Sequence, residues 1–355
     1  MQIKQWSGNL PLTRRSLSLG VVALAAMTTT FGIPAPALAN GELNLYSSRH
    51  YDTDEQLYGE FEKQSGIKIN RIEDDAGALI KRITAEGANS PADILITVDA
   101  GRLWQAEQEG MFQSTSSETL EKRIASNLRH PDGNWFGFSR RARIIFYDKE
   151  RVTEPPKTYE ELADPKYKGL VCTRSSSNIY MLSLMAAMIE HHGAEKAKEW
   201  ATGVWENRAR EPEGGDTDQL RGIASGVCGI ALANTYYFAR ALGSDVKDLT
   251  GQTDKIGWVF PNQDGRGAHV NISGAGVVKN APNKENAVKF LEYLASDSAQ
   301  KYFAAGNNEY PVVEGVETTA PLQKLGEFKA DNLDLIKLGV NQPQAQKIYD
   351  EVGYK

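Results

Sequence analysis

The 355-residue chain has little of the side-chain chemistry that enzymes and zinc sites commonly use. It contains two cysteines and five histidines, and the cysteines lack the paired spacing of a zinc site. Neither a Gly-x-Ser-x-Gly nucleophile elbow nor a His-Glu-x-x-His motif occurs. With 46 Asp and Glu against 40 Lys and Arg, the balance argues against nucleic acid and anionic membranes as partners. We therefore expect a binding protein and no enzyme.

Residues 1–39 predict an export signal. A mildly apolar run follows Arg14 and Arg15, and the small residues at 37–39 form a cleavage site. The arginine pair fits a twin-arginine signal, and an ordinary secretory leader is the alternative. The leader has no acidic residue, so the mature chain is more acidic than the formal charge of −6. We expect a periplasmic protein without an integral membrane segment in the mature chain.

Strand and helix patterns alternate along the mature chain, which predicts an α/β fold with two lobes. Residues 41–110 form a βαβαβα series, and parallel sheets bind ligands at the carboxyl ends of their strands. The apolar stretch 135–147 is expected to cross between the lobes, and 256–261 to make the return crossing. The predicted bounds are 40–138 with about 268–315 for lobe 1, 139–267 for lobe 2, and 316–355 for a C-terminal helical segment of lobe 2.

Two adjacent tyrosines, Tyr236 and Tyr237, follow an apolar strand-like run and begin a helix that Gly243 can end. Adjacent side chains converge on one point only near such a junction between strand and helix. A phenol has a pKa near 10, so phenolates need stabilisation from a helix N-terminus or a trivalent cation. Hard oxygen donors suit a hard cation such as Fe(III). The alternative is packing, in which the rings are buried and the hydroxyls find partners.

Other aromatic hydroxyls occupy the same kind of junction. His50 and Tyr51 lie in the loop after the first predicted strand, and Tyr180 lies between the strand at 169–173 and the next helix. The alternative for His50 is an exposed or capping residue. His50 and Tyr51 are therefore a second candidate ligand group, and Tyr180 occupies the same kind of position.

The two cysteines, Cys172 and Cys228, lie in a predicted strand and at a predicted strand start. In an oxidising compartment an even pair is typical of one disulfide. The alternative is two buried free thiols, and the sequence leaves both open.

Several segments, taken together, resemble a known family, and the resemblance covers essentially the whole mature chain. The chain is similar to the periplasmic ferric-iron-binding proteins, above all to the cyanobacterial branch that serves an iron(III) ABC transporter. The segments that carry the resemblance are the export leader, Tyr46-Ser47-Ser48-Arg49-His50-Tyr51, Arg174-Ser175-Ser176-Ser177-Asn178-Ile179-Tyr180, Asn234-Thr235-Tyr236-Tyr237 and Ile272-Ser273-Gly274-Ala275-Gly276-Val277.

The resemblance implies a type II periplasmic solute-binding fold with a ligand cleft between two lobes. It implies that Fe(III) is held by Tyr51 from one lobe and by Tyr180, Tyr236 and Tyr237 from the other. His50 is a ligand in some relatives and not in others. The tyrosine at 180 favours ligation by the protein without a synergistic anion, and the serines at 175–177 leave binding of such an anion open.

Four phenolates around Fe(III) carry an excess negative charge, which a low-dielectric cleft tolerates poorly without a nearby cation. Arg240 follows Tyr236 by one helical turn, and Arg49 and Arg141 lie in neighbouring predicted segments. The arginines that could serve as this cation are Arg49, Arg140, Arg141, Arg143 and Arg240.

We expect a monomer that closes around Fe(III) and delivers it to an inner-membrane ABC permease. One alternative is a receptor for a small anion such as phosphonate or thiosulfate, with Arg174 and the serines at 175–177 as its cradle. Another is a protective iron-scavenging protein that uses the same site. The sequence leaves open the coordination number, the oxidation state carried in the cell, the permease, and whether release needs reduction, protonation or forced opening.

Overall fold

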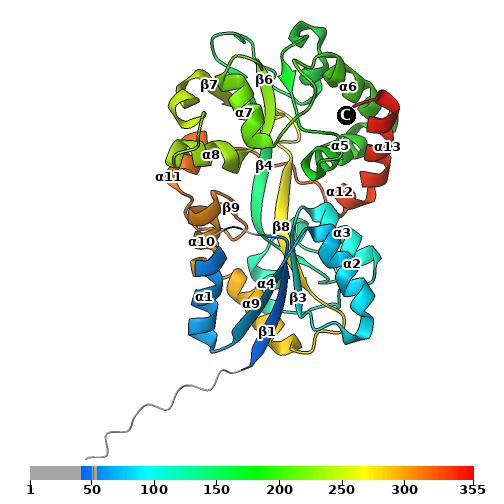
Figure 1. Ribbon diagram of the computed structural model, residues 1–355, viewed down its shortest axis with the longest axis vertical. Helices are drawn as coiled ribbons and strands as arrows, with labels where there is room; N and C mark the ends of the chain where they lie inside the picture. Colours follow the sequence, from blue (N-terminus) through cyan, green and yellow to red (C-terminus); the bar gives the residue numbers. More distant parts are fainter. Residues whose placement is uncertain (1–40, 50, 52–53) are drawn as a thin grey trace, which may run out of the picture. The chain divides into compact units, whose positions relative to one another are not determined.

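The computed structural model describes residues 41–49, 51 and 54–355, so the predicted export signal and His50 lie outside the described part of the chain. Within it, nine strands form one mixed sheet in the order β2-β1-β3-β8-β4-β6-β5, and β7 and β9 each pair with β4 (Figure 1). The strands are β1 (Glu42–Ser47), β2 (Lys68–Glu73), β3 (Ile94–Val98), β4 (Phe136–Asp148), β5 (Val171–Cys172), β6 (Ile230–Asn234), β7 (Ile256–Val259), β8 (Val270–Val277) and β9 (Tyr310–Pro311).

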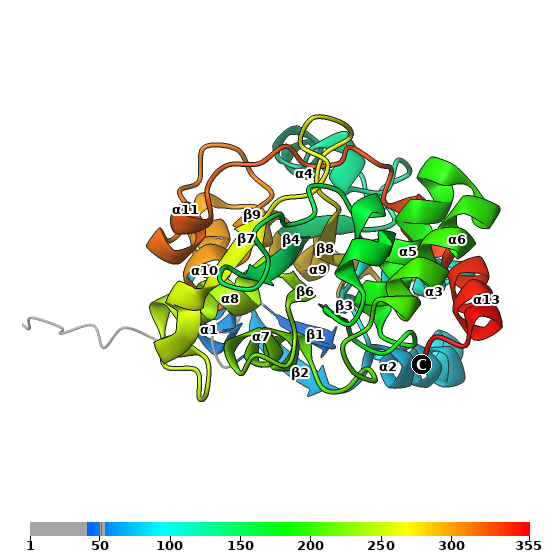
Figure 2. The same ribbon diagram turned by 90° about the horizontal axis from the view of Figure 1, so that it is seen from above.

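Helices connect and cover the strands (Figures 1 and 2). None of the helices in the described ranges is both long enough and apolar enough to cross a membrane. The helices are α1 (Asp54–Ser65), α2 (Ala76–Glu86), α3 (Ala100–Gln108), α4 (Glu118–Arg123), α5 (Ile179–His192), α6 (Ala194–Glu206), α7 (Asp216–Ala224), α8 (Thr235–Gly243), α9 (Lys284–Leu294), α10 (Asp297–Asn307), α11 (Ala320–Leu325), α12 (Ile336–Val340) and α13 (Gln342–Val352).

The elements from β1 to α4, with α9 and α10, pack around one cluster of buried side chains, and we call them the first lobe. β1 is parallel to both β2 and β3, which confirms the predicted βαβαβ series. Local sequence explains the helix ends. Asp75 caps α2 by accepting a hydrogen bond from the backbone N–H of Gly77 at 2.8 Å, and Gly87, with φ of 57°, follows its last residue.

The elements β5 to β7, with α5 to α8, pack around two further buried clusters, and we call them the second lobe. β5 is parallel to β6, and β6 is antiparallel to β4. Asn178 caps α5 by accepting from the backbone N–H of Tyr180 at 3.1 Å, and Gly193, with φ of 80°, follows the last residue of that helix. β6 therefore leads directly into α8, whereas the segment 173–178 connects β5 to α5.

The long strand β4 runs through both lobes, as the sequence predicted for 135–147 (Figure 1). Its first half, Phe136 to Ala142, pairs with β8, and its second half pairs with β6 and β7. The predicted return crossing at 256–261 is wrong. β7 pairs with Ile145–Asp148 and remains in the second lobe, whereas β8, which also pairs with β3, makes the return. Both runs are short and apolar, so the local pattern does not separate them.

The C-terminal segment contacts both lobes. α11 packs on α8, α13 packs on α5 and α6, and α12 packs on both α3 and α5. Figures 1 and 2 both place α13 beside α5 and α6. A Cβ at Gly339 of α12 would collide with the side chain of Trp104 on α3, so these helices approach closely. The lobe bounds read from the sequence, including the assignment of 316–355 to lobe 2, stay a prediction.

Candidate metal centre

The four tyrosines singled out in the sequence come together in the structure. The hydroxyl oxygens of Tyr180 and Tyr236 are 3.2 Å apart, and the rings of Tyr236 and Tyr237 stack with centroids 4.2 Å apart. Tyr51 interacts electrostatically with Tyr180, Tyr236 and Tyr237. We call these four residues the tyrosine cluster.

Each member of the cluster lies where a strand gives way to a helix. Tyr51 lies between β1 and α1, Tyr180 is in the first turn of α5, and Tyr236 and Tyr237 are in the first turn of α8. Helix N-termini carry partial positive charge, which favours phenolate over phenol. The residue before α8, Asn234, does not cap the helix with its side chain.

Burial acts against ionisation of the cluster. It raises the pKa of the Tyr51 phenol to about 12, and Glu309 and Tyr180 add to this effect while Arg49 and Arg141 oppose it. Burial also raises the pKa values of Tyr180, Tyr236 and Tyr237 above the usual value of a phenol. The cluster is therefore uncharged near neutral pH unless a cation enters it.

Two buried arginines lie beside the cluster and share one carboxylate. Arg49 donates to Glu309 at 3.1 Å and to Asp54 at 3.0 Å, and Arg141 also donates to Glu309. Both guanidinium groups donate to the hydroxyl of Ser273, at 2.7 and 2.5 Å. The Arg49 guanidinium lies 4.9 Å from the ring centroid of Tyr51.

A second pair of arginines lies near the ring of Tyr180. Arg143 donates to Asp216 at 3.0 Å and to the side-chain oxygen of Asn234 at 3.2 Å. Arg174 is 3.9 Å from Asp216, and both guanidinium groups lie over the Tyr180 ring at 6.0 and 5.7 Å from its centroid. Asn234 is thus engaged by an arginine, which explains why it does not cap α8.

Ion pairs surround the cluster. Four guanidinium groups and three carboxylates take part in them, and the buried carboxylate of Asp99 also interacts electrostatically with Arg141. The members of this network are Arg49, Arg141, Arg143, Arg174, Asp54, Asp216 and Glu309.

A small cavity lies behind Tyr180. It measures ≈10 Å³, which is room for about one water molecule, and Arg141, Asn234 and His269 contribute to its lining. Burial, with Arg143 and Arg266, lowers the pKa of His269 to about 3, so its imidazole is neutral. Neutral His269 adds no further positive charge.

The acidic members of this network were missed in the sequence. Glu309 lies 260 positions after its partner Arg49, and Asp216 lies 73 positions after its partner Arg143. No local sequence pattern therefore links either carboxylate to its arginine. Asp216 begins α7 in a Gly-Gly-Asp-Thr-Asp segment that reads as an ordinary helix start. Arg49 and Arg141 lie in the network, and their role in charge compensation stays a prediction. Arg240 is half-buried on α8, and its role stays a prediction, as does that of His50.

Histidine and acidic side chains make other contacts. Within residues 41–49, 51 and 54–355, no group of three or more His, Cys, Asp or Glu is placed to hold a metal ion. His191 is 2.6 Å from Asp331, and His192 is 2.7 Å from Glu160. The two histidines at the end of α5 thus pair with carboxylates.

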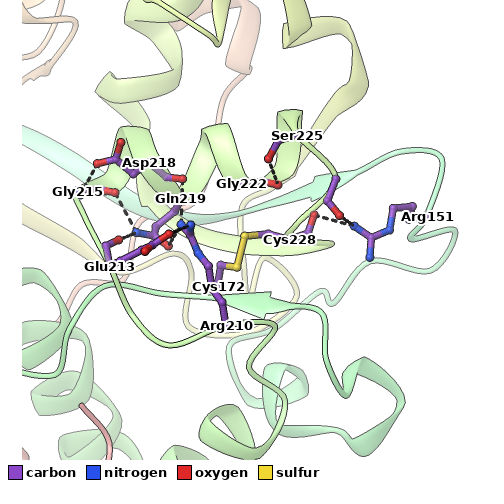
Figure 3. Close-up of a disulfide and its surroundings, with 11 residues drawn as sticks. Arg151, Cys172, Arg210, Glu213, Gly215, Asp218, Gln219, Gly222, Ser225 and Cys228 are labelled. Carbon is purple, nitrogen blue, oxygen red and sulfur yellow. Dashed lines mark hydrogen bonds and ion pairs between the residues drawn. A yellow bond between two sulfur atoms is a disulfide. The ribbon is translucent and has the colours of Figure 1, made fainter.

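The two cysteines are bonded to each other in the structure, with their Cα atoms 5.8 Å apart (Figure 3). Cys172 is in β5, and Cys228 precedes β6. Gly222 of α7 packs directly against this bond, where a Cβ would collide with the Cys228 sulfur. The bond therefore joins the two strands that lead to Tyr180 and to Tyr236.

Comparison with known proteins places this geometry among transport receptors. Residues 89–336 match the family model described as bacterial extracellular solute-binding protein. Iron uptake protein A1 from Synechocystis is 52% identical over 315 residues, which cover 88% of this chain and 88% of that protein. The solved structure of Trichodesmium FutA (IdiA), in complex with iron and citrate, is 54% identical, with a TM-score of 0.86 over 89% of this chain and 100% of that chain. A ferric binding protein from Campylobacter jejuni is 41% identical, with a TM-score of 0.83 over 88% of this chain and 100% of that chain.

Proposed function

We propose a function on the premise that this chain belongs to the bacterial extracellular solute-binding proteins, in the branch of the ferric-iron-binding receptors. The protein captures Fe(III) with the phenolates of the tyrosine cluster and delivers it to an ABC permease. Hard, anionic oxygen donors favour Fe(III) over the larger and less charged Fe(II).

The observation that carries this proposal is the convergence of four phenols, two of them buried and two half-buried, beside a network of four arginines. Four phenolates around Fe(III) carry one excess negative charge. The nearby guanidinium groups would offset this charge, which a low-dielectric surrounding without cations tolerates poorly. Without the metal, burial keeps the phenols protonated.

The ligands come from two lobes, and this supplies the mechanism of capture. Tyr51 follows β1 of the first lobe, whereas Tyr180, Tyr236 and Tyr237 belong to helices of the second lobe. A cation that binds ligands of both lobes stabilises the closed arrangement, because it cannot keep Tyr51 together with the three tyrosines of the second lobe when the lobes separate. The closed form would then present a surface that the permease recognises.

A contact between the lobes supports closure as part of this mechanism. Ser183 of α5 donates to the carboxylate of Asp99, which caps α3 in the first lobe, at 2.8 Å from both oxygens. Asn271 of β8 also donates to this carboxylate, at 2.9 Å. Opening of the lobes would break the hydrogen bond from Ser183.

The relatives support iron as the cargo, and the extracellular solute-binding family supports the periplasm as the site of action. Two curated relatives are iron uptake proteins of Synechocystis, and a third, 27% identical over 351 residues, is the major ferric iron-binding protein of Neisseria meningitidis. Export by the leader at 1–39, action as a monomer and transfer to an inner-membrane permease are part of the proposal. The proposal also includes a role for Arg240 in charge compensation and a role for His50 as a further ligand of the iron.

A panel of ions tests this function without relying on any substitution. We expect Fe(III), kept soluble by a weak chelator, and the redox-inert trivalent ion Ga(III) to raise the midpoint of thermal unfolding at one ion per chain. Zn(II) and phosphate alone should leave the midpoint unchanged. A shift with phosphate alone and none with either trivalent ion would instead identify an anion receptor.

A further inference from the structure

Arg140 and Arg141 are neighbours on β4 and serve opposite faces of it. Ser139 donates to Glu309 at 2.9 Å, and Arg141 donates to the same carboxylate, so these two side chains face the tyrosine cluster. Successive side chains of a strand alternate between its faces. Arg140 therefore lies on the face of β4 that is turned away from the cluster.

A cavity adjoins this second face at the point where β4 passes between the lobes. Arg140 pairs across the sheet with Tyr310 of β9, and both residues line this space of ≈590 Å³, which we call the rear cavity. Val316, which packs on the first-lobe core, forms part of its wall. Leu322 and Phe328, which pack with a second-lobe core, form another part.

Two polar groups at the rear cavity have no partner. The Nε atom of Arg140 and the hydroxyl of Tyr310 are buried, and neither has a hydrogen-bond partner in the described part of the chain. The Tyr310 side chain is only 7% exposed. Arg49 and Arg141 share Glu309, whereas no carboxylate within the described ranges lies at ion-pair distance from Arg140. Arg140 is half-buried, and a partly desolvated cation without a counter-ion is unfavourable, so a bound anion would stabilise it.

We propose that the rear cavity binds a small organic monocarboxylate with an apolar body. The guanidinium of Arg140 and the hydroxyl of Tyr310 would donate to its carboxylate. Val316, Leu322 and Phe328 would cover its apolar part, and the volume is in the range of small-molecule sites. Glu317 and Glu327 also line the cavity and disfavour a second negative charge on the ligand.

A ligand in the rear cavity would affect iron binding in the cleft because of where the cavity lies. Its walls come from both lobes, so a ligand that fits one arrangement of the lobes better than another shifts their equilibrium. By linkage, the ligand and Fe(III) would then change each other's affinity by the same factor. This consequence rests on the proposed iron function, whereas the existence of the rear site does not.

Calorimetric titration of the iron-free mature protein with benzoate tests the site directly. We expect saturable binding of one benzoate per chain, with benzyl alcohol and the dianion isophthalate binding at least about tenfold more weakly. Arg140→Met should weaken benzoate binding by about tenfold or more, and Tyr310→Phe by a smaller factor. Arg82→Gln, which changes an arginine of α2 that pairs with Glu86, is the matched control and should bind like the wild type.

Three results would overturn the proposal: no saturable binding of benzoate to the wild type, equal binding to Arg140→Met, or tighter binding of isophthalate than of benzoate. Tyr310→Phe retains the ring and removes only an unpartnered hydroxyl, so it should fold and remain informative if Arg140→Met does not. Titration with Fe(III) in the presence and absence of benzoate then measures, as a separate experiment, whether benzoate changes the affinity for iron. Failure of iron binding alone would leave the benzoate result, and with it the rear site, unaffected.

Discussion

The hydroxyl oxygens of Tyr180 and Tyr236 lie 3.2 Å apart, although 56 positions separate the two residues in the chain. The bonded cysteines Cys172 and Cys228 are also 56 positions apart, so each cysteine precedes its tyrosine by the same number of residues. Strand β5 has only two residues and pairs with β6 over only that length. The disulfide therefore supplements a short strand pairing that sets the distance between the two tyrosines.

Removal of the disulfide should weaken both stability and the metal site. For Cys172→Ser with Cys228→Ser, we expect the free energy of unfolding to fall by about 4 kcal/mol, because the unfolded chain gains the freedom of a long loop. Urea unfolding measures this loss. The disulfide would no longer hold β5 in place, so iron affinity should fall as well. Unchanged stability and unchanged iron affinity would refute the role of the disulfide in positioning the tyrosines.

Iron binding should strengthen as pH rises. The phenols of the cluster are protonated in the iron-free protein, since burial raises their pKa values and that of Tyr51 reaches about 12. Each tyrosine that binds as a phenolate must release a proton, so binding should release up to about four protons per iron. Proton release in weakly buffered solution measures this number. Binding without proton release would contradict phenolate ligation.

The carboxylate of Glu309 should have opposite effects on stability and on ionisation of the cluster. Glu309→Gln leaves Arg49 and Arg141 without their shared counter-ion, so the free energy of unfolding should fall by about 3–5 kcal/mol. Glu309 also raises the pKa of Tyr51. Iron binding by the folded variant should therefore begin at lower pH than in the wild type.

The matched control for this variant is Glu314→Gln, which changes an exposed carboxylate. It should alter neither the free energy of unfolding nor the pH at which iron binds. A Glu309→Gln protein with wild-type stability would show that the carboxylate does not hold the two arginines.

The buried carboxylate of Asp99 should make stability depend on pH. Burial raises its pKa to about 6, although hydrogen bonds from Ser183 and from the backbone of Gly101 oppose this shift. A raised pKa means that the folded state binds the proton more tightly, so the ionised form costs stability increasingly as pH rises from about 4 to about 6. Above that window the cost is constant.

Asp99→Asn, which keeps a side-chain oxygen to cap α3, removes this titration. We expect the free energy of unfolding of the variant, relative to the wild type, to rise by up to about 3 kcal/mol between pH of about 4 and about 6. Urea unfolding at several pH values measures the difference. A difference that stays constant across the window would show that Asp99 does not titrate there.

The strand-to-helix junctions could be predicted from the sequence because their signals are local. Apolar runs, capping residues such as Asn178 and terminal glycines such as Gly193 define where β5 gives way to α5 and where that helix ends. The fold class and the positions of all four tyrosines at such junctions follow from these signals. The parallel arrangement of β1, β2 and β3 follows as well.

The network of arginines and carboxylates could not be predicted, because only the tertiary fold brings the residues of each ion pair together. Glu309 is 260 positions from Arg49 and 168 from Arg141, so neither partner marks the other in the sequence. Asn234 reads as a helix cap but accepts a hydrogen bond from Arg143 instead. The sequence pattern does not identify which strand returns to the first lobe, because β7 and β8 are both short and apolar and only pairing with β3 distinguishes β8.

The central claim is that the tyrosine cluster binds Fe(III), and a visible absorption spectrum tests it most directly. The mature protein is titrated with Fe(III) in a weak chelator, beside the Tyr236→Phe, Tyr237→Phe double variant and a Tyr302→Phe control from α10. We predict a saturable phenolate-to-iron charge-transfer band at one iron per chain in the wild type and the control, and its loss in the double variant. A band of full intensity in the double variant, or none in the wild type, would contradict the claim.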